Sequence, residues 1–270
     1  MLGLISSSLK SPAIERHSYT LETMYLAPPI FLVIAFIFAL IGLGGSQLYI
    51  PILFWLGMDF KTQAIPLGML LNVVNSSSAA WIYGRKKMIE WKVAIPFGIS
   101  MILLAPVGTW INVQLPTEPI ILIFALFTAS AGLLMLSGWG PKSGGLSSRQ
   151  RILLGITAGS GLGFFAGLIG RGGGSFVVPL LYMAGLEAKL AAATSAMVVT
   201  FSGSSSFISH IAAAARPVWH VWMLCVIAVF LGSQIGSRLM AEKLKSQSVR
   251  VIFGWILLGV ALLLIMKHVL

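Results

Sequence analysis

The sequence predicts an all-α integral membrane protein built from two duplicated halves, and two observations lead to this prediction. Of the 270 residues, 57% are hydrophobic and only 9% are charged, whereas a soluble domain carries charge at about a quarter of its positions. Apolar runs also recur along nearly the whole chain, and a run of about 20 apolar residues is enough to span a bilayer. A water-soluble fold is therefore excluded, and the lipid bilayer is the expected partner.

Charge and cysteine content exclude several other classes. The 18 Lys and Arg residues exceed the 7 acids and give a net charge of +11, but they gather at the ends of apolar runs and not in one basic stripe. This placement follows the positive-inside rule, so no nucleic-acid partner is expected. The single cysteine, Cys225, lies inside an apolar run and cannot form an internal disulfide or a Cys/His metal cage. Neither a metal site nor a cofactor is predicted.

Eight hydrophobic segments follow one another along the chain. Before them, residues 1–27 hold several serines and charges and are expected to form a tail at the membrane surface. The segments are 28–57, 64–84, 92–114, 118–138, 151–185, 190–214, 219–240 and 250–268.

Glycine clusters interrupt the first and fifth segments and reveal an internal repeat. They read Gly42-Leu43-Gly44-Gly45-Ser46 and Gly170-Arg171-Gly172-Gly173-Gly174-Ser175, and an offset of 128 residues superimposes them. The same offset aligns Pro51 with Pro179 and Trp91 with Trp219. This self-similarity indicates two repeats, 28–138 and 151–270, joined by the Gly- and Ser-rich linker 139–150 within one transport unit.

The charged loops favour an inverted relation between the repeats. The loop after the second segment is basic in the first half, and the loop after the third segment is basic in the second half. If the glycine-broken helices cross the bilayer, the repeats are parallel. If they are re-entrant, the repeats are inverted, and the opposite charge bias of the matching loops favours this arrangement. We expect both termini outside and both glycine breaks near the midplane.

Paired breaks of this kind indicate a substrate site. Irregular backbone at membrane depth must line a cavity or be buried in protein. Unwound backbone offers N–H groups, and each restarting helix offers its positive N-terminal end, so the site is suited to a small anion. Arg171 is the only charged residue inside an apolar segment and is expected to face a cavity. The alternative reading is that the glycines only permit close packing and that Arg171 snorkels to an interface.

A polar helix follows each break. Asn72 and Asn75 share one helix face and are expected at the site, because a carboxamide in a membrane needs several partners. Small hydroxyl residues commonly pack helices together, so the triplets 76–78 and 204–206 are interpreted as packing residues. His210 could carry a proton. A Ser175–His210 hydrolase is a distant alternative, because the sequence has no Gly-x-Ser-x-Gly elbow, so the chain is not expected to be an enzyme.

Both glycine motifs, each followed by a proline within five residues, resemble the duplicated motif of the TauE/SafE sulfite exporter family over residues 28–268. The resemblance implies a multi-pass protein of the bacterial inner membrane that exports sulfite, sulfoacetate or related organosulfonates. An anion uptake permease or channel of the same fold is the alternative. A homo-oligomer is possible. The implied substrate contacts, with Arg171 as the charge partner and Asn72 and Asn75 from the polar helix, are Gly44, Gly45, Ser46, Gly172, Gly173, Gly174 and Ser175.

The positions of the acids predict how export is driven. Proton-coupled carriers usually place an acid or a histidine inside the membrane, yet none of the seven acids lies within an apolar segment. An anion leaving a cell that is negative inside gains about 2.3 kcal/mol per charge per 100 mV. Electrogenic or weakly coupled efflux is therefore expected.

Overall fold

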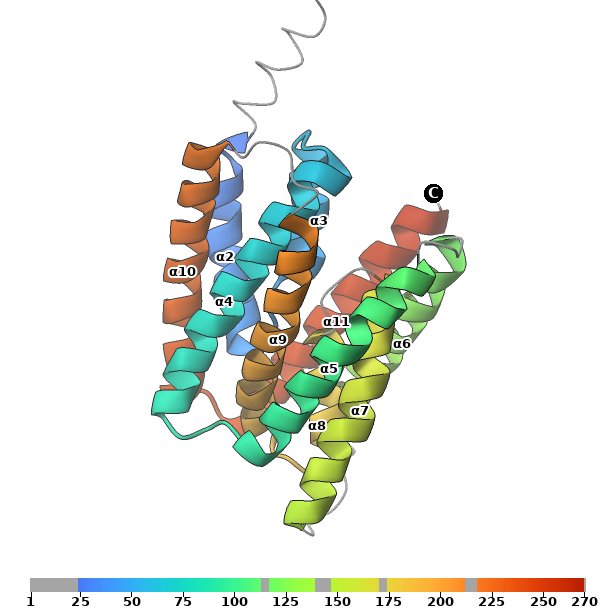
Figure 1. The fold of residues 1–270 in the computed structure, drawn as a ribbon. Coiled ribbons are helices and arrows are strands. Elements are labelled where there is room, and N and C mark those ends of the chain that lie inside the picture. The colour runs from blue at the N-terminus through green and yellow to red at the C-terminus, as the bar shows by residue number, and fades with distance from the viewer. Residues whose placement is uncertain (1–23, 113–116, 139–146, 170–173, 212–217, 270) are drawn as a thin grey trace, which may run out of the picture.

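The computed structural model describes residues 24–112, 117–138, 147–169, 174–211 and 218–269. Within these ranges the chain is all-helical and contains no strand (Figure 1). The helices are α2 (Ala27–Leu40), α3 (Ser46–Trp55), the π-helical turn η1 (Phe60–Ala64), α4 (Ile65–Arg85), α5 (Trp91–Asn112), α6 (Thr117–Ser137), α7 (Ser148–Ile169), α8 (Gly174–Met183), α9 (Ala188–Ile211), α10 (Trp219–Glu242) and α11 (Ser246–Val269).

Each hydrophobic segment corresponds to one or two helices, with bounds within a few residues of those expected. The first segment contains α2 and α3, and the fifth contains α7 and α8. The largest differences are that α7 and α11 begin earlier than expected, at Ser148 and Ser246. Most of the predicted tail 1–27 and of the linker 139–150 lies outside the described residues. The π-helical turn was not anticipated, because its polar residues Lys61, Thr62 and Gln63 lie between the apolar segments 28–57 and 64–84.

Contacts between helix ends fix the direction of each helix. The Tyr25 ring, just before α2, stacks on His220 at the start of α10, with centroids 6.2 Å apart. Lys86 after α4 forms an ion pair of 2.9 Å with Glu242 at the end of α10. Thus α2, α4 and α10 all begin at the face that is uppermost in Figure 1, called the upper face here.

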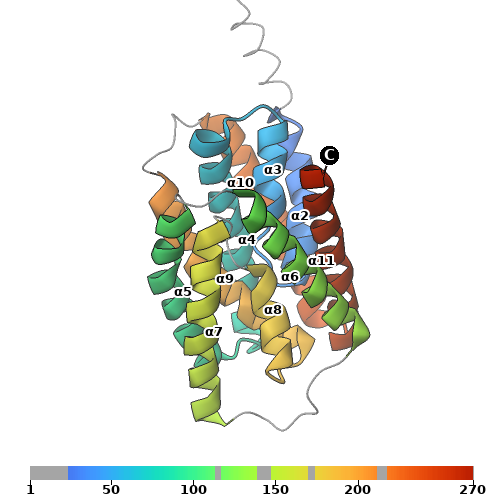
Figure 2. The same ribbon diagram turned by 90° about the vertical axis from the view of Figure 1, so that its right-hand side faces the viewer.

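The opposite, lower face is where α5, α7, α9 and α11 begin. Arg151 near the start of α7 pairs with Glu90 just before α5, at 2.6 Å. The Glu90 backbone N–H also donates to Thr194 Oγ1 in the first turns of α9, at 3.1 Å. The short helices α3 and α8 lie beside α4 and α9, and each returns toward the face from which α2 or α7 starts (Figures 1 and 2).

Two seams of close packing join helices that are far apart in sequence. α10 packs on α2, and α7 packs on α5. In the first seam a Cβ on Gly232 or Gly236 would overlap the backbone carbonyl oxygen of Leu32 or Phe36. In the second, α7 brings Gly155, Gly159 and Gly163 against the α5 backbone around Phe97 and Met101. Small residues let helix backbones approach closely, which is how helices associate in membranes.

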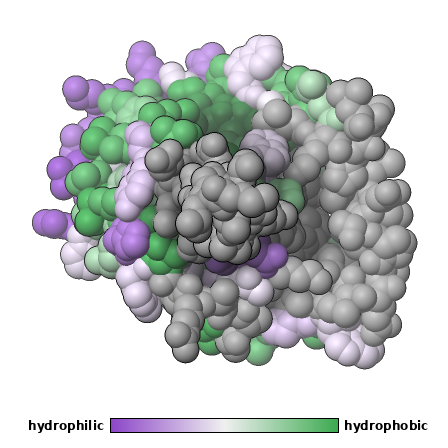
Figure 3. Space-filling view, turned by 90° about the horizontal axis from the view of Figure 1, so that it is seen from above, coloured by the Kyte–Doolittle hydropathy of each residue, from purple (hydrophilic) through white to green (hydrophobic). Residues whose placement is uncertain are grey.

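The exterior is apolar, as expected for contact with lipid. Within the described residues, three helices are long and apolar enough to cross a membrane: Thr62–Arg85, Ala188–Ile208 and Trp219–Glu242. Large apolar side chains such as Leu103 (64% exposed) and Ile227 (51%) point outward. Seen from the upper face, hydrophobic residues cover much of the coloured surface, and hydrophilic ones lie at its margin and near the centre of the view (Figure 3). Such an exposed apolar surface is unstable in water and stable in a bilayer.

Candidate functional site

The chain between α2 and α3 turns by means of two glycines. Gly42 and Gly45 have φ of 72° and 92°, in the left-handed region that other L-residues rarely adopt. Gly45 is the N-cap of α3. A Cβ on Gly42 would overlap the backbone carbonyl of Ala192 on α9. The turn is therefore held close against a helix of the second half, and a side chain at residue 42 would prevent this contact.

Two carboxamides from α4 bind the backbone of this turn. Asn75 Nδ2 donates to the carbonyl oxygens of Leu43 and Gly44, at 3.2 and 3.1 Å. Asn72 Oδ1 accepts a hydrogen bond from the Ser46 backbone N–H, at 3.2 Å. Asn72, Asn75 and Ser46 are all buried, with exposures of 1% or less. One N–H that the sequence predicted to face an anion is thus donated to Asn72 in this conformation.

The second half of the chain completes the surroundings. Ser195 Oγ on α9 donates to the Gly42 carbonyl oxygen at 3.1 Å, and Ser233 Oγ on α10 donates to the Asn75 carbonyl oxygen at 2.8 Å. Gly203 on α9 faces Asn72 so closely that a Cβ there would lie 2.6 Å from Asn72 Nδ2. The cluster therefore lies between α4 of the first half and α9 and α10 of the second.

Four buried polar atoms in this region have no hydrogen-bond partner within the described part of the chain. They are Asn72 Nδ2, Asn75 Oδ1, Gln47 Oε1 and the Tyr49 hydroxyl. A buried polar group without a partner costs about 1 to 3 kcal/mol, so native proteins keep few of them. Gln47 and Tyr49 belong to α3 and Asn72 and Asn75 to α4, so these atoms on two neighbouring helices are candidates for contact with a polar ligand.

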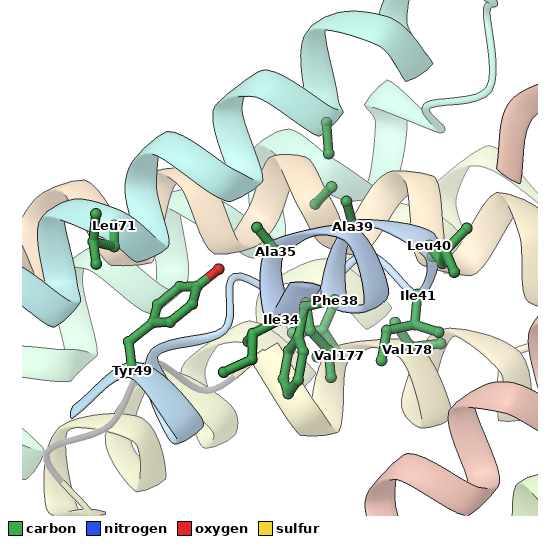
Figure 4. Packing of buried hydrophobic residues seen from close by; sticks show 14 of the residues in the cluster. Ile34, Ala35, Phe38, Ala39, Leu40, Ile41, Tyr49, Leu71, Val177 and Val178 are labelled. Atoms are coloured by element: carbon green, nitrogen blue, oxygen red, sulfur yellow. The ribbon is translucent and has the colours of Figure 1, made fainter. Parts of the chain in front are cut away.

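Sequence reasoning missed Gln47 and Tyr49. Gln47 is a carboxamide inside an apolar run, and Tyr49 is part of the motif that follows the glycines, so both carried a signal. The Tyr49 ring lies beside Gly45, where a Cβ would be 2.7 Å from it. Its hydroxyl points between Leu71 of α4 and Ala35 of α2 (Figure 4). Gln47 and Tyr49 are of interest because their polar atoms have no hydrogen-bond partner among the described residues. Only the packed structure reveals this.

The structure brings together the first-half residues predicted for the site, Gly44, Gly45, Ser46, Asn72 and Asn75. A Cβ on Gly44 would overlap Asn72 Oδ1. Of the second-half residues, Arg171, Gly172 and Gly173 lie outside the described residues. Gly174 is the first residue of α8, and Ser175 follows it in the same turn. The side chains of Ser175 and His210 also lie outside the described part, so their predicted roles stay predictions.

The serine triplets mainly bond their own helices. Ser76 Oγ donates to the Asn72 carbonyl oxygen at 2.8 Å, and Ser204 Oγ donates to the Thr200 carbonyl oxygen at 2.7 Å. Ser78 differs, because its hydroxyl accepts a hydrogen bond of 2.7 Å from Gln234 Nε2 on α10. This pattern satisfies the hydroxyls within the helix bundle. It leaves the amides beside the turn as the groups available to a ligand.

Comparisons with known proteins identify a matching family and several relatives. The family model described as "Sulfite exporter TauE/SafE" matches residues 28–264. A "Probable membrane transporter protein" of Xylella fastidiosa (strain Temecula1) is 27% identical, covering 87% of this chain and 92% of the relative. "Probable membrane transporter protein YunE" of Bacillus subtilis is 24% identical over 86% and 93%, and "Probable membrane transporter protein YfcA" of Escherichia coli K12 is 25% identical over 83% and 86%. No solved structure matches the chain.

Proposed function

Because the chain belongs to the TauE/SafE sulfite exporter family and is a membrane transporter, we propose that it exports small sulfur-containing anions across the bacterial inner membrane. Sulfite, sulfoacetate and related organosulfonates are the proposed cargo. Uptake of the same anions, or a channel mode, is the alternative. The observation that carries the proposal is the buried Asn72 amide beside the turn, whose Nδ2 has no partner in the described residues. An amide N–H of this kind can donate to an oxyanion.

We propose that the anion is held between the two glycine turns. Asn72 Nδ2 and the Tyr49 hydroxyl supply donors on the first-half side. On the second-half side we assign Gly172, Gly173, Gly174 and Ser175, with Arg171 as charge partner. The first-half donors Asn72 and Tyr49 are uncharged. Because binding an anion at membrane depth also needs a positive charge or a helix N-terminus, we assign the charged group to the second-half side.

We further propose that the halves, 28–138 and 151–270, are inverted repeats with re-entrant breaks. The proposal is supported by the helix directions, because α2 descends from the upper face and α7 rises from the lower one. It is also supported by the packing. An offset of 128 residues carries α2 onto α7 and α5 onto α10, so that the α2–α10 seam corresponds to the α7–α5 seam.

Cysteine accessibility tests this topology. In a variant whose Cys225 is replaced by serine, single cysteines are placed at Asp59 and Glu187, which follow α3 and α8. An impermeant thiol reagent added outside cells should label residue 59 and not residue 187. Labelling of both residues from the same side would contradict inversion and favour parallel repeats.

The distribution of charge orients the molecule. The lower face gathers basic residues from four loops or helix starts, and the positive-inside rule assigns such a face to the cytoplasm. The basic residues there are Arg85, Lys86, Lys87, Lys92, Arg149, Arg151, Lys189, Arg238, Lys243, Lys245 and Arg250. Both termini are then outside, and the exported anion moves from the lower face to the upper face.

Efflux from proteoliposomes tests the activity. Vesicles loaded with sulfite, sulfoacetate or, as a control, chloride are diluted, and anion exit is followed by mass detection. A potassium diffusion potential set negative inside should accelerate sulfur-anion exit without a proton gradient. Exit that ignores voltage and follows only a pH step would overturn the electrogenic mechanism and implicate His210 or the protonation of the cargo.

Variants then test the site and the alternatives. Asn72→Ala should weaken cargo binding by about 0.5 to 3 kcal/mol, the range for one hydrogen bond to a neutral or charged partner. Arg171→Lys should impair transport if recognition is bidentate, because Lys acts as a point charge. Ser175→Ala should reduce affinity only in part. Complete loss of a hydrolytic activity in that variant would instead support the hydrolase.

A further inference from the structure

A seam between α4 and α10 runs from mid-membrane to the lower face and forms two successive cavities. The inner one, of about 460 Å³, is apolar and is lined by Val74, Ser77, Ser78, Val226, Ile227 and Phe230. The outer one, of about 490 Å³, is lined by Ile82, Arg85, Lys86, Arg238 and Glu242. The Gln234–Ser78 hydrogen bond lies between them along the seam.

The lining residues form one strip on each helix. On α4, residues 74, 78, 82 and 85 recur every three to four positions, and on α10 residues 226, 230, 234, 238 and 242 recur every four. Residues with this spacing share a helix face. From Val74 to Arg85 the helix rises about 17 Å, which is close to the depth of one leaflet of a hydrocarbon core about 30 Å thick.

Two guanidinium groups give the outer cavity its charge. Lys86 and Glu242 neutralise each other in their 2.9 Å ion pair. Arg238 donates to the neutral Gln234 Oε1 at 3.3 Å, and Arg85 has no ion pair in the described part of the chain. Arg238 also interacts electrostatically with Glu242, but three cations and one acid line the cavity. The cavity therefore keeps an excess of positive charge, and its two guanidinium groups match phosphate oxygens in pairs.

The depth of these arginines is that of lipid headgroups. Trp81 and Trp91, which flank the end of α4, are 66% and 46% exposed, and tryptophans exposed at helix ends mark the membrane interface. Farther along the seam Ile227 and Phe230 are 51% and 47% exposed, so the apolar cavity opens sideways toward lipid.

From this arrangement we propose that the α4–α10 seam binds one anionic glycerophospholipid of the lower-face leaflet. Its phosphate lies between Arg85 and Arg238, and an acyl chain follows the apolar cavity toward Val74. A basic pocket between helices on the cytoplasmic side is a known way of binding anionic headgroups. The combination of charge and an apolar groove one leaflet deep distinguishes a lipid from a soluble phosphate. The site is separate from the glycine turns and does not depend on the cargo.

Native mass spectrometry of the purified full chain tests the proposal. The protein, in a neutral detergent, is titrated with phosphatidylglycerol, phosphatidylcholine and inorganic phosphate, and bound lipid is counted. Phosphatidylglycerol should be retained in preference to phosphatidylcholine, and millimolar phosphate should not displace it. Displacement by phosphate would assign the cavity to a soluble anion and overturn the lipid site.

Matched variants locate the lipid. Arg85→Gln with Arg238→Gln should weaken phosphatidylglycerol retention about thirtyfold. The control pair, Lys87→Gln with Lys245→Gln, removes the same charge from exposed residues of the same face that do not line the cavity and should have little effect. Equal losses in both pairs would show diffuse electrostatic attraction and not a site.

A second variant tests the groove without changing any charge. Ile227→Trp fills the apolar cavity and should also reduce phosphatidylglycerol retention. The small amount of phosphatidylcholine that the protein retains should not change. Unaltered phosphatidylglycerol binding would overturn the acyl-chain part of the proposal. Ile227 lies on the exposed surface of α10, so this variant is expected to fold. If the Arg85→Gln, Arg238→Gln double variant does not fold, the Ile227→Trp variant alone tests the lipid site.

Discussion

The glycine clusters at 42–46 and 170–175 match in sequence, but the polar helices α4 and α9, which come later in each half, carry different polar groups. In the first half α4 presents Asn72 and Asn75 to the turn. The 128-residue offset aligns these with Thr200 and Gly203 on α9. Thr200 Oγ1 donates to the Ala196 carbonyl of its own helix at 2.8 Å, and Gly203 has no side chain. α9 instead uses Ser195 to bond the first turn.

This difference shows that α4 and α9 both contact the turn between α2 and α3. α4 binds it with amides, and α9 with a hydroxyl and with the close approach of Ala192 to Gly42. Apart from η1, the two halves have the same order of helices in the described residues, and their polar groups differ. Stability should therefore respond far more strongly to changes at residues 42, 72 and 75 than to changes at the aligned positions in α9.

The largest effect is expected for Gly42→Ala. The substitution places a Cβ in a left-handed conformation and against the Ala192 backbone, so we expect a loss of about 3 to 5 kcal/mol in unfolding free energy. Gly185→Ala is the control, because Gly185 has a similar φ of 87° but open space around it, and only about 1 to 2 kcal/mol should be lost. Unfolding in mixed micelles measures both. Equal losses would show that the contact with α9 does not matter.

Asn75→Leu should have the next largest effect. It removes the donor of two buried carbonyl oxygens at similar side-chain volume, and we expect a loss of about 2 to 3 kcal/mol. The comparison is Thr200→Val, which removes a hydroxyl bonded within its own helix, and about 0.5 kcal/mol or less is expected. Thermal melting in detergent reports both values. A larger loss for Thr200→Val would reverse the asymmetry between the halves.

Ser195→Ala should have a smaller effect, of about 1 kcal/mol, because one hydrogen bond to the Gly42 carbonyl is lost. Ser204→Ala is matched to it, since the Ser204 hydroxyl donates to the Thr200 carbonyl of the same helix. Both are followed by chemical unfolding. If Ser204→Ala costs as much as Ser195→Ala, the contact from α9 to the first turn contributes no more than an ordinary helix serine.

The smallest change in stability is expected for Tyr49→Phe. The Tyr49 hydroxyl is buried without a partner among the residues that the structure describes, so its removal should leave stability unchanged or raise it by about 1 kcal/mol. Anion efflux should nevertheless fall if this hydroxyl donates to the cargo. A loss of stability would show that the hydroxyl has a partner in the folded protein, and normal efflux would remove it from the proposed site.

Much of this fold could be predicted because the bilayer fixes both the length and the hydropathy of the helices that span it. The segment 64–84 corresponds to α4 at Ile65–Arg85, and the glycines at 42–45 mark where α2 and α3 separate. The neighbours of each helix could not be predicted. Lipid is as apolar as leucine, so hydropathy does not say which helix packs on which. The contacts of Ser233 with Asn75 and of Arg151 with Glu90 follow only from the assembled bundle.

The candidate site was predictable to a similar degree. Asn72 and Asn75 stand out because carboxamides are rare and demanding in apolar helices. Their actual partners, the Ser46 N–H and the carbonyls of Leu43 and Gly44, depend on where the turn sits beside α4. Gln47 and Tyr49 were missed for the same reason, since a sequence shows which atoms need partners and not which atoms lack them.

The two glycine-lined seams have a mechanical consequence. Each seam fastens a helix of one half to a helix of the other, α10 to α2 and α7 to α5, with backbone so close that Gly232 and Gly159 leave no room for a methyl group. Sliding or parting along such a seam would lose many close contacts at once. We therefore expect α2 and α10 to move together, and α5 and α7 to move together, so that any moving unit would combine helices of both halves.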